Sequence, residues 1–311
     1  MDESGTINVH FCPQENCEQL FISQLEIANK TLDCALYEID EPHVWQALDA
    51  AVARNVTVRV VMDGDYMKDA QIAKTAAVDR LYVRFDTASG LMHNKFCIVD
   101  GHMVTSGSMN PTVSDMTKNF NNIIFINAAD TNGIAQNYET EFSELWAGKF
   151  RQGAPNAQSQ FVINGTRIEQ YFCPDDNCEA HVIAALKRAN TSIRFMTFSF
   201  TSFPIANAII AANKAGVLTQ GLYEKRQVND YSVFNDLTSH DVSAIAAKNP
   251  TGGQLHDKVF IIDNETVVTG SYNPTKNGDE GNDENILIIH NPQIAGQFLE
   301  NYAQIHALAT N

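Results

Sequence analysis

The chain repeats itself, and this repeat restricts its possible folds more than any other feature of the sequence. The segment FCPQENCE at residues 11–18 returns as FCPDDNCE at residues 172–179, which is 161 positions later. In both copies a helical pattern follows, and then a strand-like apolar run at residues 32–39 and 193–200. The sequence therefore predicts two similar halves.

Each copy continues with a second helix and a further strand, at residues 56–62 in the first and 217–223 in the second. Strands that alternate with helices in this way indicate an α/β fold. Residues 151–166 are rich in Gly, Gln, Asn and Ala, which is typical of a linker. We therefore expect a first half at residues 7–150 and a second half at residues 167–309, each long enough for its own core.

Late in each half the same reactive and polar residues recur. The first half has HNKFCIVD at residues 93–100 and GSMNPT at 107–112, and the second has HDKVFIID at 256–263 and GSYNPT at 270–275. Both read HxKx4D, then six residues, then GSxNPT, and the copies are 163 positions apart. A single HxK is usually a surface or structural histidine. A duplicated site that has lost its activity is the alternative, but every fixed position is present in both halves.

The spacing within the motif has a physical meaning. His and Lys at alternate positions of a strand project from the same face. The GSxN segment ends the neighbouring strand and brings a hydroxyl and an amide beside them. Imidazole, ammonium and amide together suit a phosphate group, and a second set related by pseudo-two-fold symmetry would double the positive charge. The residues of the two sets are His93, Lys95, Ser108 and Asn110, and His256, Lys258, Ser271 and Asn273.

These motifs resemble the signature of the phospholipase D superfamily, and the resemblance covers essentially the whole chain. The compact halves are similar to small bacterial endonucleases that dimerise to assemble one site from two motifs. Residues 189–201 and 282–285 add to this likeness. The resemblance implies a mixed β-sheet flanked by helices in each half, and a monomer that acts as a fused pseudo-dimer.

The resemblance also implies a mechanism with two displacements. One imidazole attacks phosphorus and forms a phosphohistidine, while the other protonates the leaving oxygen and then activates water. Asp100 and Asp263 would be structural, and Ser108 and Ser271 would assist at the phosphate oxygens. These roles require neither a metal ion nor another cofactor. The residues expected to hold the nonbridging oxygens are Lys95, Lys258, Asn110 and Asn273.

The two halves differ at one informative position. Glu284 lies 28 residues after His256, where the superfamily often has an acid that binds a catalytic imidazole, and its counterpart in the first half is Asn121. In family members this acid can come from the opposite half, so we expect Glu284 to pair with His93. An orienting carboxylate fixes the tautomer and stabilises the imidazolium. On this basis His93 is predicted to be the nucleophile and His256 the general acid and base.

The cysteines form two local pairs and two isolated positions. Two C-x4-C pairs occupy equivalent places in the halves: Cys12 with Cys17, and Cys173 with Cys178. Disulfides are favoured for them, which indicates an oxidising compartment. Free thiols are the second interpretation and a four-thiolate zinc site the third, because zinc motifs more often have two intervening residues. Cys34 and Cys97 stand in apolar strands and are expected to be buried thiols.

Composition sets limits on partners. The chain is 44% hydrophobic, so it is globular, and no apolar run is long enough to insert stably into a membrane. Its net charge of −16 opposes polyanions at long range but is compatible with a local basic groove. Lys225 and Arg226 follow a strand of the second half, where they either contact a substrate phosphate or form a solvated turn. The polar, acidic start does not resemble a signal peptide, whereas the paired cysteines weakly favour secretion.

Three functions fit this sequence. The first is an endonuclease that acts on DNA or RNA, favoured by the compact halves and the nuclease-like stretches. The second is a phospholipase D or phosphatidyltransferase acting on lipid head groups, although such enzymes tend to carry longer insertions. The third is a catalytically silent module that binds phosphate.

Overall fold

The computed structural model describes residues 2–67, 80–128 and 133–310. The strands that belong to the first half are β2 (Gly5–Cys12), β3 (Thr31–Leu36), β4 (Thr57–Asp63), β5 (Leu81–Asp86), β6 (Lys95–Val99), β7 (Met103–Gly107) and β8 (Asn121–Ala128). The equivalent strands of the second half are β10 (Thr166–Cys173), β11 (Ser192–Thr197), β12 (Leu218–Glu224), β13 (Ser243–Ala247), β14 (Lys258–Ile262), β15 (Thr266–Gly270) and β16 (Glu284–His290). Two short strands are added, β1 (Asp2–Glu3) and β9 (Gln160–Ile163).

Helices follow the same repeat. The first half has α1 (Cys17–Glu26), α2 (Pro42–Ala53), α4 (Val113–Thr117), α5 (Ile134–Trp146) and the 3-10 turn η1 (Gly64–Tyr66). The second half has α6 (Cys178–Leu186), α7 (Phe203–Lys214), η2 (Lys225–Gln227), α8 (Phe234–Ser239), α9 (Lys276–Glu280) and α10 (Pro292–Thr310).

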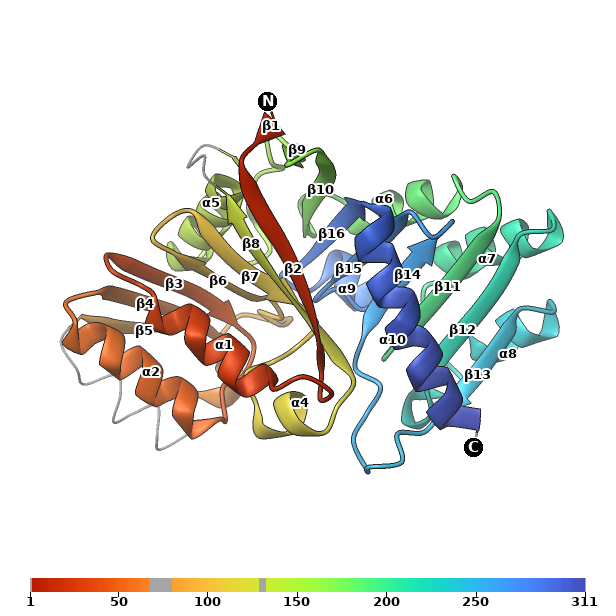
Figure 1. The fold of residues 1–311 in the computed structure, drawn as a ribbon, viewed down its shortest axis with the longest axis horizontal. Coiled ribbons are helices and arrows are strands. Elements are labelled where there is room, and N and C mark those ends of the chain that lie inside the picture. The colour runs from red at the N-terminus through yellow and green to blue at the C-terminus, as the bar shows by residue number, and fades with distance from the viewer. Residues whose placement is uncertain (1, 68–79, 129–132, 311) are drawn as a thin grey trace.

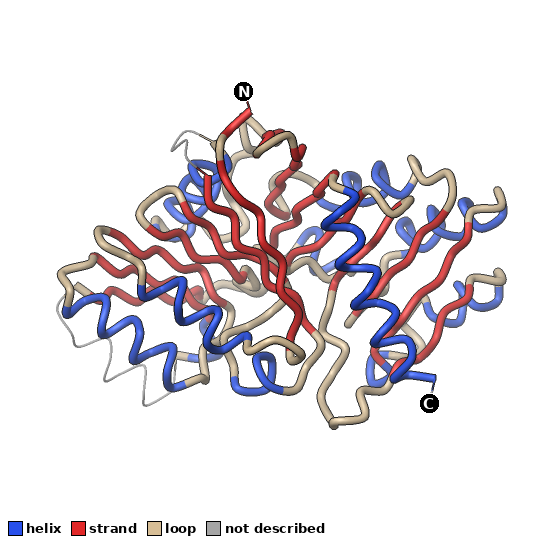
Figure 2. Tube along the Cα trace, viewed as in Figure 1, coloured by secondary structure: helices blue, strands red, loops and turns tan. Residues whose placement is uncertain are grey.

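The strands form two sheets that meet near the middle of the molecule (Figure 1, Figure 2). The first sheet has the order β2-β8-β7-β6-β3-β4-β5. The second has the order β1-β9-β10-β16-β15-β14-β11-β12-β13, which is the same order once β1 and β9 are left out. In each sheet the last three strands run parallel to one another, and the other neighbouring strands pair antiparallel, except for the short parallel pair β1–β9 in the second sheet. The predicted α/β fold with two similar halves and mixed sheets is confirmed.

Both faces of each sheet are covered, which explains why the central strands are apolar throughout. Every residue of β6 and of β14 is buried, as expected for strands between two layers. Helices α1 and α2 pack on the outer face of the first sheet, and α6, α7 and α8 on that of the second. Helices α5 and α10 lie between the sheets, where side chains of both halves form one shared core.

The contacts between the halves are reciprocal. Met92 of the first half forms a β-bridge with Asp283 of the second, and Leu255 of the second forms the equivalent bridge with Phe120 of the first. The backbone N–H of His93 donates to the carbonyl of Asp283 at 3.0 Å, and that of His256 to the carbonyl of Phe120 at 2.9 Å. Reciprocal contacts of this kind are the pattern of a two-fold interface, and they lie directly beside both motif histidines.

The segment expected to be a linker, residues 151–166, also contributes to the fold. It contains β9, which pairs with β10, and β1 at the start of the chain pairs with β9 in turn. Arg151 is largely buried and its guanidinium donates to Asp86 at 2.6 Å and to Asp283 at 2.9 Å. The connection between the halves is therefore anchored at both of its ends.

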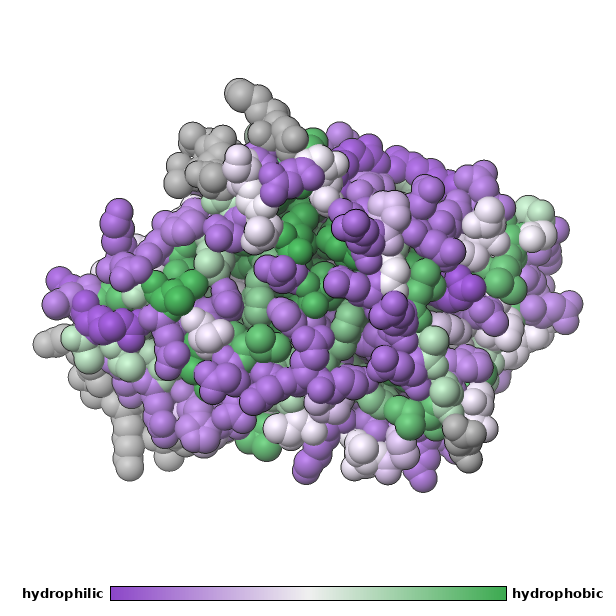
Figure 3. All heavy atoms as spheres, viewed as in Figure 1, coloured by the Kyte–Doolittle hydropathy of each residue, from purple (hydrophilic) through white to green (hydrophobic). Residues whose placement is uncertain are grey.

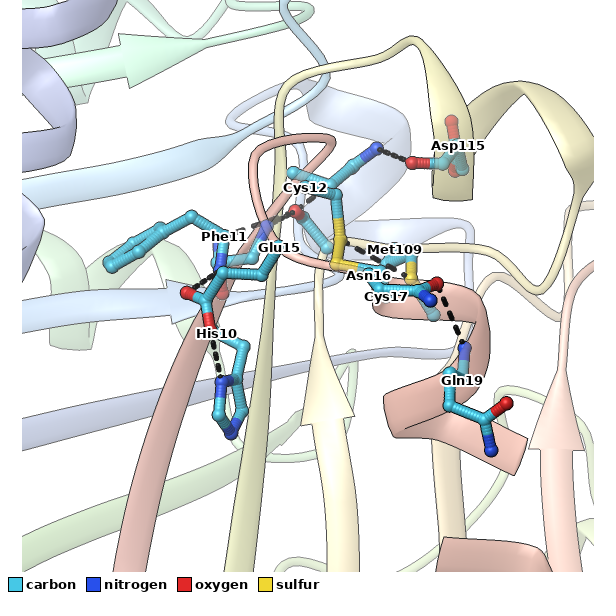
Figure 4. The surroundings of a disulfide bond; sticks show 12 residues. His10, Phe11, Cys12, Glu15, Asn16, Cys17, Gln19, Met109 and Asp115 are labelled. Carbon is cyan, nitrogen blue, oxygen red and sulfur yellow. Dashed lines mark hydrogen bonds and ion pairs between the residues drawn. A yellow bond between two sulfur atoms is a disulfide. The ribbon is translucent and has the colours of Figure 1, made fainter. Parts of the chain in front are cut away.

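The local cysteine pairs are disulfides in the structure, Cys12–Cys17 and Cys173–Cys178. Each connects the end of a strand to the start of the following helix, and Figure 4 shows the first of them with Met109 against it. The prediction for Cys34 and Cys97 was wrong, because these two residues also form a disulfide. They are directly opposite each other on the antiparallel strands β3 and β6. Because they are 63 residues apart in the sequence, the sequence alone did not indicate this register.

The surface is mainly hydrophilic, in keeping with 37 acidic and 21 basic residues. Hydrophilic side chains cover most of the face seen in Figure 3, interrupted by apolar patches. Among the described residues, each helix is too short or too polar to cross a membrane.

Candidate active site

The motif histidines and lysines stand at the point where the two sheets meet. Lys95 begins β6 and Lys258 begins β14, and each histidine lies two residues earlier, beside the bridge to the other half. The GSxN segments follow β7 and β15. Gly107 and Gly270 have φ values of 133° and 148°, and a Cβ at either position would lie within 2.4 Å of a backbone oxygen. Only glycine fits there, and it allows the chain to turn toward the motif.

Each histidine is held by residues of the opposite half. Nδ1 of His93 lies 2.7 Å from Oε2 of Glu284, and both side chains are buried. Nδ1 of His256 lies 2.9 Å from Oδ1 of Asn121. Among the described residues no hydrogen bond engages Nε2 of either ring. The expected pairing of Glu284 with His93 is present in this structure.

His256 has a second neighbour that the sequence did not indicate. Oδ2 of Asp115 lies 3.3 Å from Nδ1 of His256 and comes from α4 of the first half. The position 163 residues later, on α9, is Gly278. Each histidine therefore has one carboxylate from the other half, but the two carboxylates come from different positions of the repeat.

Burial and nearby positive charges lower the pKa of both imidazoles. His93 is only 6% exposed and His256 7%. Burial lowers the pKa of His93 well below its ordinary value, and the charges of Lys95 and Lys258 act in the same direction. Burial also lowers the pKa of His256, but here Asp115 opposes the shift. The two rings thus differ in how easily they hold a proton.

The two carboxylates differ as well. Burial opposes ionisation of Asp115, yet His256 and hydrogen bonds from Asn119 and Asn110 hold its pKa below the ordinary value. Burial raises the pKa of Glu284 to about 7, and the opposing effect of Lys95 is smaller. Asp115 is therefore a fixed negative charge near neutral pH, whereas Glu284 and His93 lie close together with both charged forms disfavoured.

The lysines of both halves act on one site. Burial lowers the pKa of Lys95 to about 7 and that of Lys258 to about 8. The positive charge of Lys258 also lowers the pKa of Lys95. Each Nζ donates to the carbonyl of its own motif histidine at 2.6 Å. Among the described residues neither amine forms an ion pair with a carboxylate, and two buried amines of this kind are suited to an anionic ligand.

The polar residues of the GSxN segments divide into two groups. The hydroxyl of Ser108 donates to Asn121 at 3.0 Å and accepts from the N–H of Asn122, and the hydroxyl of Ser271 accepts from the N–H of Asn285 at 2.9 Å. These serines contact the strands that carry the histidine partners. Asn110 donates to Asp115, and buried Oδ1 atoms of Asn110 and Asn273 have no hydrogen-bond partner in the described structure.

The aspartates of the motif lie at the other end of β6 and β14. Asp100 accepts hydrogen bonds from the N–H groups of Asn29, Lys30 and Thr31, and Asp263 from the equivalent groups before β11. Burial opposes ionisation, but these N–H donors lower the pKa of both carboxyls, to about 2 for Asp263. Their contacts are those of residues that fix the strand, as expected for a structural role.

Lys225 and Arg226 are exposed on η2. The guanidinium of Arg226 donates to the carbonyl of Gly252 at 2.9 Å and lies 3.8 Å from Glu224. Within the part of the chain that the structure describes, neither residue has a hydrogen bond or ion pair with a motif residue. In the described chain two groups of side chains have the spacing of metal ligands, and neither contains a motif residue: Glu18, Glu41 and His43, and Glu141, Glu144 and Asp175.

The sequence did not identify two further pairs of residues near the site. Asn122 donates to Asp257 at 2.7 Å and accepts from Thr269, and Asn285 donates to Asn94 at 2.7 Å and accepts from Ser106. Both asparagines thereby hold the residue between His and Lys of the other half. Their equal spacing of 163 in the repeat was the signal that would have found them.

The second pair is aromatic. The ring of Tyr37 is 4.8 Å from that of His93, and the ring of Phe198 is 4.9 Å from that of His256. The ammonium groups of Lys95 and Lys258 lie over the same two rings at 5.3 and 5.4 Å. Both rings are half-buried, so each histidine has an aromatic neighbour at the margin of the site.

Comparison with known proteins agrees with this geometry. The family model described as "Cardiolipin synthase, PLD-like domain" matches residues 21–146 and again residues 182–306. The chain belongs to this phospholipase D-like family. The two matches coincide with the two halves, and each matched region contains one of the two motif sets.

Individual relatives match one half at a time. The mitochondrial cardiolipin hydrolase of Xenopus laevis is 35% identical over 43% of this chain, and the match spans 65% of that relative's length. A phospholipase D of Rickettsia typhi is 28% identical over 47% of this chain and 77% of its own. The crystal structure of Nuc from Salmonella typhimurium, a phospholipase D family member, is 33% identical over 46% of this chain and 95% of its own, with a TM-score of 0.44.

Proposed function

We propose that the protein is an endonuclease that hydrolyses DNA or RNA phosphodiester bonds without a metal ion, through a phosphohistidine intermediate. The observation that carries the proposal is the reciprocal arrangement of the histidines. Nδ1 of each ring is bound by the opposite half, which leaves Nε2 as the nitrogen available for chemistry. One chain therefore supplies both imidazoles, and we propose that it acts as a monomer.

In the first step Nε2 of His93 attacks phosphorus and forms the N–P bond, while the P–O bond to the leaving alcohol breaks. Nε2 of His256 gives its proton to that oxygen. In the second step the same nitrogen takes a proton from water, whose oxygen attacks phosphorus as the N–P bond breaks. One difficult displacement is thus divided into two easier ones, and His93 and His256 end in their starting states.

Four side chains would stabilise the phosphoryl group during both steps. Lys95 and Lys258 bring positive charge, and Asn110 and Asn273 bring amide groups, to the place where negative charge develops. A bound phosphodiester would restore the protonated forms of both lysines, because its negative charge compensates the repulsion and burial described above.

Nucleic acid is supported as the substrate by Tyr37 and Phe198. One aromatic ring beside each histidine offers a stacking surface on either side of the scissile phosphate, and bases stack on aromatic side chains at about 1 to 3 kcal/mol each. The net charge of −16 supplies little long-range attraction, so we expect weak binding, a preference for single strands and a shallow dependence on salt.

A phospholipase D or phosphatidyltransferase is the second candidate. It is supported by the names of the curated relatives, a mitochondrial cardiolipin hydrolase and a phospholipase D, each of which resembles half of this chain. The same two-step chemistry would then act on a lipid head group, with water or an alcohol as the final acceptor.

The test offers single-stranded DNA, RNA, phosphatidylcholine vesicles and cardiolipin vesicles in parallel, all with EDTA. A variant with both His93→Ala and His256→Ala is the control. Cleavage of nucleic acid by the unaltered chain alone is the expected result. Turnover of lipid alone would move the assignment to the second candidate. Activity that survives in the double variant, or is abolished by EDTA, would contradict the mechanism.

A further inference from the structure

We infer that Asp115 is a positioning residue that prepares His256 to act as the general acid, in the role that Glu284 has for His93. The inference rests on the proposed function, and it assigns a division of labour to the two histidines. Asp115 and Glu284 are not equivalent in the repeat, because the position that corresponds to Asp115 in the second half is Gly278.

The first support is geometric. Oδ2 of Asp115 lies 3.3 Å from Nδ1 of His256, close enough to stabilise a positive charge on the ring, while Asn121 accepts at 2.9 Å from the same nitrogen. Both side chains are buried. A carboxylate next to an imidazole in a desolvated site favours the protonated ring. Asp115 thus opposes the lowering of the His256 pKa by burial and favours the protonated ring that the leaving oxygen needs.

The second support is that Asp115 is itself fixed and ionised. Its oxygens accept from the N–H of Asn110 at 2.8 Å, from the side chain of Asn110 at 2.9 Å and from the side chain of Asn119 at 2.6 Å. A carboxylate with several donors keeps its charge even when buried. The same contacts hold Asn110 in place, so one residue orients both the proton donor and a phosphate-binding amide.

The third support is the complementary size of the residues around each histidine. His93 has the long side chain of Glu284 beside it, and the repeat equivalent of Asp115 on α9 is Gly278, which has no side chain. Beside His256 stand the shorter Asn121 and, on α4, Asp115. The two arrangements place one carboxylate near each ring by different routes, so exchange of both residues is expected to restore function where a single change does not.

The charged groups around His256 come from three other elements. Asp115 on α4 favours its protonated form, whereas Lys258 on β14 and Lys95 on β6 oppose it. Asp115 is therefore the carboxylate that opposes the effect of these two lysines on His256.

The experiment compares two leaving groups on one phosphate. The first substrate is an alkyl diester, dithymidine monophosphate or, if only lipid is turned over, phosphatidylcholine. The second is the p-nitrophenyl ester of the same thymidine 5′-phosphate or phosphatidic acid. A nitrophenolate leaves without a proton, whereas an alkoxide requires one. A general-acid defect therefore affects the alkyl ester selectively, and a merely structural defect affects both.

For Asp115→Asn we expect kcat on the alkyl ester to fall about 10- to 100-fold, and on the aryl ester less than about 3-fold, because the variant keeps the imidazole and loses only part of the roughly 10²- to 10⁴-fold that general acid catalysis contributes. The matched control is Asp236→Asn on α8, an aspartate 3.6 Å from His240 and outside the site, which should leave both rates unchanged. Equal losses on the two esters would overturn the inference.

The exchange variant Asp115→Gly/Asn121→Glu gives the first half the residues of the second. We expect it to recover alkyl-ester activity to within about 5-fold of the unaltered chain, since a carboxylate again reaches His256. If it folds normally by circular dichroism but remains as impaired as Asp115→Asn, the inference is wrong. If the unaltered chain turns over neither ester in a His93-dependent way, the proposed function fails, and the inference with it.

Discussion

The two halves place the same strands, the same lysine and the same histidine around the site, yet they supply the histidine partners differently. His93 is bound by Glu284, at the family position of the second half, whereas His256 has Asn121 at the equivalent position and Asp115 nearby. The two subunits of a homodimer cannot differ in this way, because they have the same amino-acid sequence. Duplication within one chain allows each imidazole to have its own electrostatic surroundings.

The largest expected difference between the halves is the response of the two histidines to the leaving group. His93→Ala should reduce turnover of alkyl and aryl diesters alike, by about 10³- to 10⁴-fold, which corresponds to about 4 to 5 kcal/mol in the barrier. His256→Ala should cause a similar loss with the alkyl ester but a much smaller one in the first turnover of the aryl ester. Rapid-quench kinetics with both esters would measure this, and identical profiles for the two variants would remove the proposed asymmetry.

A second difference concerns stability. Cys34 and Cys97 form a disulfide between β3 and β6, and the equivalent pair in the second half is Phe195 and Phe260, whose ring centres are 6.3 Å apart. Because this disulfide closes a loop of 63 residues, Cys34→Ala/Cys97→Ala should cost about 2 to 4 kcal/mol of unfolding free energy.

The loss should be confined to the first half, which hydrogen exchange of β3 and β6 compared with β11 and β14 would show. Cys12→Ser/Cys17→Ser is the matched control, since its loop of 5 residues predicts a smaller effect. A larger loss from the local pair than from Cys34 and Cys97 would contradict this ordering.

A third comparison sets Glu284 against Asp115. Glu284→Gln removes the carboxylate that orients His93 and stabilises its developing positive charge, so kcat should fall about 10- to 100-fold. In contrast to Asp115→Asn, this loss should be the same for alkyl and aryl esters, because the nucleophile is needed for both. Steady-state kinetics on the two esters decide the point, and selective loss of the alkyl ester would assign Glu284 to the acid instead.

The smallest effect is expected from pH. Burial lowers the pKa of Lys95 to about 7 and of Lys258 to about 8 in the free protein. Both amines lose their positive charge as the pH rises through these values, so kcat/KM should decline above about pH 7, by up to tenfold per pH unit. The value of kcat should decline less, because bound phosphate keeps the lysines protonated. A kcat/KM that stays constant up to pH 9 would contradict the lysine role.

Most of the fold was predictable because the repeat encodes it twice. The motifs repeat at a spacing of 163 residues, and the strands of the two sheets have the same order. Both observations reflect the same internal repeat. The pairing of Glu284 with His93 was also expected, since the family places this acid in the opposite half. Local cysteine pairs were accessible for a similar reason, because a bond across 5 residues requires no knowledge of the sheet.

What the sequence did not reveal depends on contacts that the repeat does not conserve. Asp115 corresponds to Gly278 in the second half, so the repeat does not mark it as a site residue. Its proximity to His256 depends on how the two halves pack together. Cys34 and Cys97 become partners only through the register of β3 with β6. Asn122 and Asn285 are repeated, but their function appears only when each meets the motif of the other half.

The most direct test of the account is to locate the covalent intermediate. A His256→Ala variant is mixed with the p-nitrophenyl diester, quenched in alkali, and digested for mass spectrometry. Without a general base the intermediate should accumulate. The account predicts that His93 becomes phosphorylated in about one equivalent per chain, and that the same amount of nitrophenol is released in a burst. Phosphate on another residue, or a burst that persists in His93→Ala/His256→Ala, would contradict the assignment of His93 as the nucleophile.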